Sequence, residues 1–113
     1  MSQSPYQIRG VVADGEYLSQ SIAQYYERHY ITVTFFSDEY ITPVIPTGGT
    51  VTFTATDDGF NYGTPKEPVN GIVQASNPAY TRPNFGGKIQ KVKATTSGIA
   101  GATHFIAVVN SYN

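Results

Sequence analysis

Residues 49–59 read Gly-Thr-Val-Thr-Phe-Thr-Ala-Thr-Asp-Asp-Gly. Apolar and threonine side chains alternate strictly up to residue 56, which is the period of a β-strand with one buried and one wet face. Val51, Phe53 and Ala55 therefore form the expected core face, and the threonines between them form the outer face. The Asp-Asp-Gly that follows favours a turn, because Asp bonds its own backbone and Gly accepts a positive φ.

The same period of two recurs along the chain, with Ile31, Val33 and Phe35 on one parity and threonines between them. Residues 16–26 fit a helix as well as a strand, and we favour a strand because the neighbouring segments are strands and aromatics suit a sheet. About seven to eight short strands separated by Gly- and Pro-rich turns predict an all-β, antiparallel two-sheet β-sandwich, either Ig-like or jelly-roll-like. The other predicted strands are 7–13, 71–75, 88–95 and 102–112.

Composition limits the size and the partners of the protein. The 113 residues, of which 40% are hydrophobic and 13% charged, are enough for one core. We expect a single domain over 1–113, with 1–6 as a flexible N-terminal arm. Seven basic residues against eight acidic ones make nucleic acid and membrane poor partners. The chain has no cysteine, which excludes disulfides, thiolate catalysis and Cys-ligated metal.

No catalytic constellation stands out. His29 and His104 are the only histidines, and neither has a nucleophile or an orienting acid at a motif spacing. Because catalysis needs a nucleophile, a base and an orienting group within reach of one another, we expect a non-enzymatic protein without a cofactor, and structural or surface roles for both histidines.

Asp57, Asp58 and Asn61 form a weak calcium candidate. Their side-chain oxygens surround one predicted turn, and calcium takes six to eight oxygen ligands. The segment lacks the fixed length and the bidentate Glu of a true calcium loop, so we favour a plain hairpin turn and no metal site. Lys88, Lys91 and Lys93 are similarly interpreted as lysines that protect an edge strand from aggregation.

The last predicted strand, 102–112, carries apolar residues on both parities. Ile106 and Val108 lie on the parity opposite the core face, which predicts a second cover such as another subunit. The irregular stretch 60–85 holds Tyr62, Tyr80 and Phe85, and aromatic side chains are enriched at interfaces. We therefore predict a protein interface that uses these five residues.

Several motifs of the chain together carry a family resemblance. They are Phe35-Phe36-Ser37-Asp38, Arg82-Pro83-Asn84-Phe85-Gly86-Gly87 and the segments 42–53, 57–63, 91–95 and 97–104. This pattern resembles small β-sandwich structural proteins of tailed bacteriophages. The likeness covers residues 7–113 and implies a virion component of the decoration, head-fibre or tail accessory type, without site residues to transfer.

The leading functional hypothesis is a non-enzymatic phage virion structural protein that decorates or cements a capsid. It would form a homo-oligomer and contact other virion proteins through many simultaneous weak contacts. We expect it in the phage particle, after assembly in the bacterial host cytoplasm. The alternative is a carbohydrate-binding or receptor-binding module, calcium-assisted or not, in which aromatic, Asn and Asp side chains hold a glycan.

Overall fold

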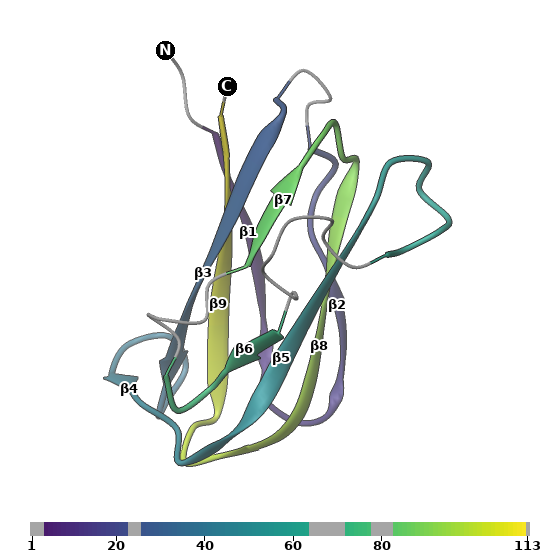
Figure 1. The fold of residues 1–113 in the computed structure, drawn as a ribbon. Coiled ribbons are helices and arrows are strands. Elements are labelled where there is room, and N and C mark those ends of the chain that lie inside the picture. The colour runs from purple at the N-terminus through teal and green to yellow at the C-terminus, as the bar shows by residue number, and fades with distance from the viewer. Residues whose placement is uncertain (1–3, 23–25, 64–71, 78–82, 113) are drawn as a thin grey trace.

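The chain folds into two antiparallel β-sheets that face each other, as Figure 1 shows. The computed structural model describes residues 4–22, 26–63, 72–77 and 83–112, which contain nine strands and no helix. This arrangement confirms the predicted all-β sandwich. The strands are β1 (Ser4–Val11), β2 (Gly15–Leu18), β3 (Arg28–Phe36), β4 (Pro43–Val44), β5 (Gly48–Thr56), β6 (Ile72–Gln74), β7 (Asn84–Gly86), β8 (Lys91–Ala100) and β9 (His104–Tyr112).

Each sheet is built around two long central strands. Sheet 1 has the order β1-β9-β3-β4, with the short β7 pairing with a different part of β3. Sheet 2 has the order β2-β8-β5-β6. β8 is thus an internal strand between β2 and β5, and the expectation that its lysines guard an edge strand is wrong.

The core lies between the sheets and follows the predicted alternation. Val51 and Phe53 of β5 have no exposed surface, whereas the threonines at 50, 52 and 54 are half-buried on the outer side. Thr56 departs from the pattern, because the turn that follows β5 covers it. From sheet 1, the inward parity of β9 contributes Phe105, Ala107 and Val109, all with no exposed surface.

Tyr17 links the two sheets at one end of the sandwich. Its ring, on β2, packs edge-on against Phe105 with 5.4 Å between the ring centroids, and its hydroxyl donates to the Val11 carbonyl at 3.0 Å. Gly10 lies opposite Phe105 in the β1–β9 register. A Cβ at Gly10 would lie 2.5 Å from the Tyr17 ring, so the ring packs where only glycine leaves room.

Several elements differ from the sequence predictions. Residues 4–6, expected in a flexible arm, belong to β1, because Ser4 and Tyr6 pair with Ser111 and Val109 of β9. Within 16–26 the strand ends at Leu18, so only the beginning of the predicted strand forms. The strands β4 and β7 have two and three residues, too short for a period-two pattern to reveal them.

Among the described residues there is no helix of the length and apolarity that a membrane crossing requires.

Candidate interaction surfaces

The outer face of sheet 1 is a regular surface formed by three long strands, β1, β9 and β3. We define it by the residues that point away from the core: the odd positions of 7–11 in β1 and the even positions of 28–36 in β3 and of 104–112 in β9. The register places Ile106 between Arg9 and Thr34, and places Val108 between Gln7 and Thr32. Both apolar side chains are partly exposed at the centre of this face.

The charges on this face are all positive. Arg9 and Arg28 are exposed at its outward positions, and none of these positions carries a carboxylate. Within the described part of the chain, no ion pair involves either arginine. Arg28 lies beside Tyr112, whose ring meets Tyr30 edge-on with 6.0 Å between the centroids. The face therefore combines aromatic and aliphatic groups with two cations.

Arg9 is held in place by an aromatic cluster at one end of the face. Its guanidinium carbon lies 5.2 Å from the centroid of the Tyr40 ring, and its Nε donates to Gln7 Oε1 at 3.0 Å. The Tyr40 ring also packs edge-on against His104 and Phe36. Tyr40 has a φ of 64°, which is costly for a bulky residue, and these ring contacts help to offset that strain.

Asp38 organises the loop that carries this ring. Its carboxylate accepts hydrogen bonds from the backbone N–H groups of Ile41 and Thr42 and from the Thr42 hydroxyl. The Thr42 donors in particular hold the pKa of Asp38 below its usual value. The negative charge of Asp38 is thus directed into its own loop.

The outer face of sheet 2 is different in kind. It carries the half-buried threonines of β5 together with Lys93, whose Nζ lies 3.8 Å from Glu16 Oε1. The same Nζ lies 4.4 Å from the centroid of the Tyr62 ring. The charge of Lys93 is therefore already compensated within the chain, and one face of the Tyr62 ring, proposed for partner or glycan contact, is occupied.

The turn after β5 is rigid and exposes an aromatic side chain. Asp58 Oδ1 accepts from the backbone N–H groups of Phe60 and Asn61, each at 2.8 Å, and from Thr56 Oγ1 at 2.8 Å; Oδ2 accepts from Asn61 Nδ2 at 2.7 Å. These donors, the Asn61 N–H first, hold the pKa of Asp58 far below its usual value. Phe60 itself is 85% exposed.

The same hydrogen bonds bear on the calcium hypothesis for Asp57, Asp58 and Asn61. A calcium ion would have to displace N–H donors from both oxygens of Asp58, which disfavours binding. The described residues contain no group of three or more His, Cys, Asp or Glu side chains arranged to hold a metal.

His29 forms a buried polar pair rather than a catalytic site. It is 1% exposed, its Nδ1 lies 2.7 Å from Ser111 Oγ, and its Nε2 lies 2.9 Å from the Gly87 carbonyl oxygen. A neutral imidazole that donates from Nε2 and accepts from the serine hydroxyl satisfies both contacts. Burial is the main cause that lowers the pKa of His29 and favours this neutral form.

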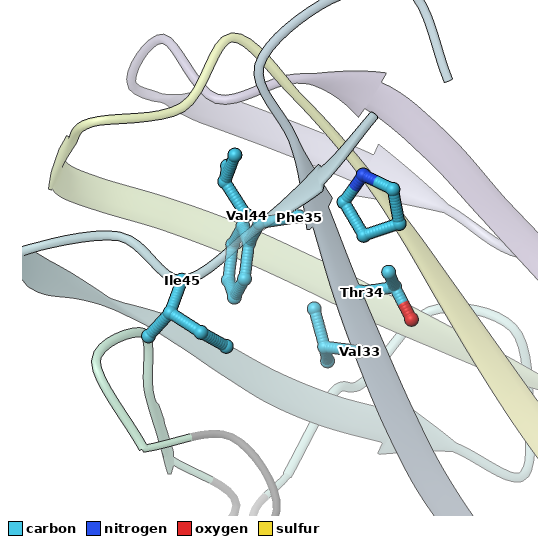
Figure 2. A pocket seen from close by; sticks show the side chains of 6 residues that line it. Val33, Thr34, Phe35, Val44 and Ile45 are labelled. Carbon is cyan, nitrogen blue, oxygen red and sulfur yellow. The ribbon is translucent and has the colours of Figure 1, made fainter. Parts of the chain in front are cut away.

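A small apolar groove opens between β3 and β4 (Figure 2). Its volume is about 370 Å³, and its lining residues are Val33, Thr34, Phe35, Pro43, Val44 and Ile45. Apart from the Thr34 hydroxyl, the side chains that line it are apolar, so the groove offers little polar chemistry for a specific small ligand.

The structure separates the five residues predicted for an interface. Ile106 and Val108 lie side by side on the outer face of sheet 1, and Tyr62 lies on the other side of the sandwich, over Lys93. Phe85 is 5% exposed, because β7 pairs with β3 so that Phe85 lies opposite His29 on the inward side. The expectation of a surface aromatic is therefore wrong there. Tyr80 lies outside the described residues.

Sequence reasoning missed Arg9, Arg28 and Phe60. Arg9 had a readable signal, because it alternates with Ile8 and Gly10 in the predicted strand 7–13 and must point outward. Phe60 stood beside a predicted turn, but composition alone does not distinguish an exposed turn aromatic from one that folds back on the core.

The fold is similar to that in the crystal structure of the SPBc2 prophage-derived protein YomS, with a TM-score of 0.51 over 98% of each chain and 12% sequence identity. At that identity the likeness shows the fold alone. No curated protein matches the chain. Residues 7–113 match the family described as "Domain of unknown function (DUF7265)". Since the match spans nearly the whole sequence, the chain belongs to the DUF7265 family.

Proposed function

We propose that this protein is a non-enzymatic structural component of a phage particle that decorates or cements the capsid through protein–protein contacts. The observation that carries the proposal is the outer face of sheet 1, with Ile106 and Val108 at its centre and the arginines Arg9 and Arg28 without an ion-pair partner in the described residues. The fold likeness to a prophage-derived protein supports a phage origin.

The chemistry of this face suits contact with protein. Tyr and Arg are enriched at protein interfaces, where Tyr provides a large apolar area at little entropic cost and Arg provides directional hydrogen bonds. The strands beneath the face are long. β9 is paired on both sides, and β3 has a second neighbour at its two ends, β7 at residues 28–30 and β4 at residues 35–36. A rigid support reduces the entropy that association must offset.

A small domain of this kind can attach tightly to a capsid when many copies bind at the same time. One such footprint is modest in area, but several copies bound to a symmetric shell act together, so that overall avidity exceeds the affinity of one contact by orders of magnitude. Neither metal nor cofactor is required for this role. The residues proposed to contact a neighbouring protein in the particle, other copies of this chain included, are Ile106, Val108, Arg9 and Arg28.

The test is the presence of the protein in purified particles. Virions of the encoding phage, or particles from the induced prophage, are banded in a density gradient and analysed by quantitative mass spectrometry. We expect the protein at a fixed copy number relative to the major head protein, and we expect particles that lack it to lose DNA at a lower temperature. Its complete recovery in the particle-free lysate would contradict the proposal.

A matched pair of variants locates the contact. Ile106→Glu places a charge at the centre of the outer face of sheet 1, and Thr52→Glu places the same charge on the outer face of sheet 2. Incorporation should fall for Ile106→Glu and remain at the wild-type level for Thr52→Glu. Equal incorporation of both variants would show that this face is not the contact.

A further inference from the structure

Two exposed features of the chain complement each other in charge and polarity. One is the acidic turn, residues 57–61, with Asp57, Asp58 and Phe60 all exposed. The other is the outer face of sheet 1, where Arg9 and Ile106 are direct neighbours in the β1–β9 register. Each feature pairs an apolar side chain with a charge, and the charges have opposite sign.

The backbone of the acidic turn is preorganised by hydrogen bonds within the chain. Four hydrogen bonds to the Asp58 side chain fix the backbone from Thr56 to Asn61. The turn extends away from the body of the sandwich beyond β5 (Figure 1). Because the backbone is already ordered, docking of the 85% exposed Phe60 ring requires little further loss of conformational entropy.

The receiving face is equally well ordered. Arg9 is oriented by the Tyr40 ring and by Gln7, and these contacts leave its charge without a carboxylate partner among the described residues. Ile106 lies beside it and is partly exposed. An aromatic ring on Ile106 and a carboxylate at Arg9 would satisfy both side chains at once.

We infer that the acidic turn of one copy docks on the outer face of sheet 1 of a second copy, with Phe60 against Ile106 and Val108 and the negative charge of the turn toward Arg9. The two contacting patches differ, so the interface is heterologous and each copy keeps one turn and one face available for further copies. Repetition of this contact produces a ring or a chain of subunits.

Charge explains why the turn, rather than a second sheet face, is the occupant. Two outer faces of sheet 1 in contact would bring Arg9 and Arg28 of one copy toward the same cations of the other, with no carboxylate at an outward strand position between them. Like charges in contact oppose association, whereas the turn brings negative charge. The heterologous pairing is therefore favoured over the face-to-face dimer.

This inference rests on the proposed function in that repeated self-contact is what a particle component uses, but its test needs no particle. Purified protein is examined by sedimentation velocity and native mass spectrometry over a wide concentration series at low and moderate salt. We expect concentration-dependent assembly beyond the dimer that weakens as salt screens the charges. A protein that stays monomeric throughout overturns the inference, even if it is found in virions.

Substitutions on each side of the proposed contact test the outer face of sheet 1 and the acidic turn separately. Arg9→Glu removes the receiving half and Phe60→Ser removes the inserting half, and each should weaken self-association by at least about tenfold. An equimolar mixture of the two variants retains one intact half from each, and should form dimers but nothing larger. Wild-type assembly by either variant, or no dimer in the mixture, contradicts a heterologous contact.

A charge swap separates electrostatic pairing from misfolding. Asp57→Arg alone should weaken assembly, and Arg9→Asp with Asp57→Arg in one chain should restore most of it. Thr52→Glu on sheet 2 serves as the matched control and should assemble normally. Circular dichroism and thermal unfolding of every variant establish that the fold is retained. No recovery in the folded double variant would exclude this pairing of charges.

Discussion

The two sheets bury similar side chains but present different surfaces to their surroundings. On sheet 2, Lys93 of β8 is paired with Glu16 and lies over Tyr62, the outward side chains of β5 at 50, 52 and 54 are threonines, and Lys91 and the exposed Leu18 lie on the same face. On sheet 1, Arg9 and Arg28 flank an apolar centre without an ion pair among the described residues. The two outer faces therefore differ in the internal contacts of Lys93 and of the two arginines.

The difference has a physical basis in hydration. Threonine hydroxyls are well hydrated by water, and their methyl groups pack along the pleated surface, so a threonine face is stable without a partner. Isoleucine and valine at the centre of an outer face gain free energy when they are covered, at about 25 cal/mol per Å² of apolar surface removed from water. Covering Ile106 and Val108 therefore favours association through sheet 1.

The largest effect on stability is expected from a substitution at Gly49, which lies in sheet 2. This residue has a φ of 101°, and a Cβ there would lie 2.5 Å from the Ile99 Cα and 2.6 Å from the Gly98 carbonyl oxygen. We expect Gly49→Ala to lower the free energy of unfolding by about 2–4 kcal/mol, through steric overlap with backbone and strain at positive φ. Urea denaturation measures the change.

Gly48 provides the matched control for this substitution. A Cβ at Gly48 has no heavy atom within 4 Å, and β5 is irregular in its pairing with β8 at this point. Gly48→Ala should change the free energy of unfolding by less than about 1 kcal/mol. Equal effects of the two substitutions would show that the close approach of Gly49 to Ile99 does not constrain sheet 2.

The second prediction concerns His29, which lies on the inner side of sheet 1. Burial lowers its pKa from the usual 6.5, so the unfolded chain binds the proton more tightly than the folded one. The free energy of unfolding should therefore be constant above about pH 7 and fall as the pH drops through 6.5. Asp38 and Asp58, whose folded pKa values are lowered, lose their contribution only in the more acidic range below the usual 3.8.

Denaturation at a series of pH values tests this assignment. His29→Ala should lower the free energy of unfolding at neutral pH by about 1–3 kcal/mol, because the buried Ser111 hydroxyl and the Gly87 carbonyl each lose a hydrogen-bond partner. The variant should also lose the stability change between neutral pH and pH 5. A slope in that window that survives the substitution would assign the titration to another group.

The long strands of both sheets were predictable because burial on one face imposes a period of two. Val51 and Phe53 face the core as predicted, and Ile106 and Val108 lie on the opposite side of β9 from the core. Their status as an interface stays a prediction. In β5, the strict alternation of threonine with apolar residues was sufficient to predict which side chains face the core.

The residues of the outer face of sheet 1 could not be grouped from the sequence, because their neighbours depend on how the strands pair. Arg9 and Ile106 are 97 positions apart, and only the β1–β9 pairing makes them neighbours. The prediction that Phe85 lies on the surface was wrong for the same reason, because β7 pairs with β3 so that Phe85 lies opposite the inward-facing His29. Side-chain pairs within one segment are visible in a sequence, whereas contacts across strands depend on tertiary structure.

The outer faces of the two sheets should respond differently to an added charge when self-association is measured. Ile106→Glu should weaken self-association by about tenfold, equivalent to about 1.4 kcal/mol, because a charge replaces the apolar contact. Thr52→Glu, at a half-buried outer position of sheet 2, should have no effect on association. Sedimentation velocity at matched concentrations measures both. Equal weakening would mean that either sheet contacts the second copy.

The smallest expected effect concerns the internal pairing of Lys93. Its side chain is 26% exposed and that of Glu16 is 64% exposed, so water and salt screen the ion pair. Lys93→Met keeps the aliphatic contact with Tyr62 while removing the charge, and should lower the free energy of unfolding by less than about 1 kcal/mol. Glu16→Gln, which leaves the contact with Tyr62 intact, should have a smaller effect still, and both effects should shrink in high salt. If Lys93→Met weakened self-association as strongly as Arg9→Glu, sheet 2 would contain an intermolecular contact, and its paired charge would not mark a hydrated face.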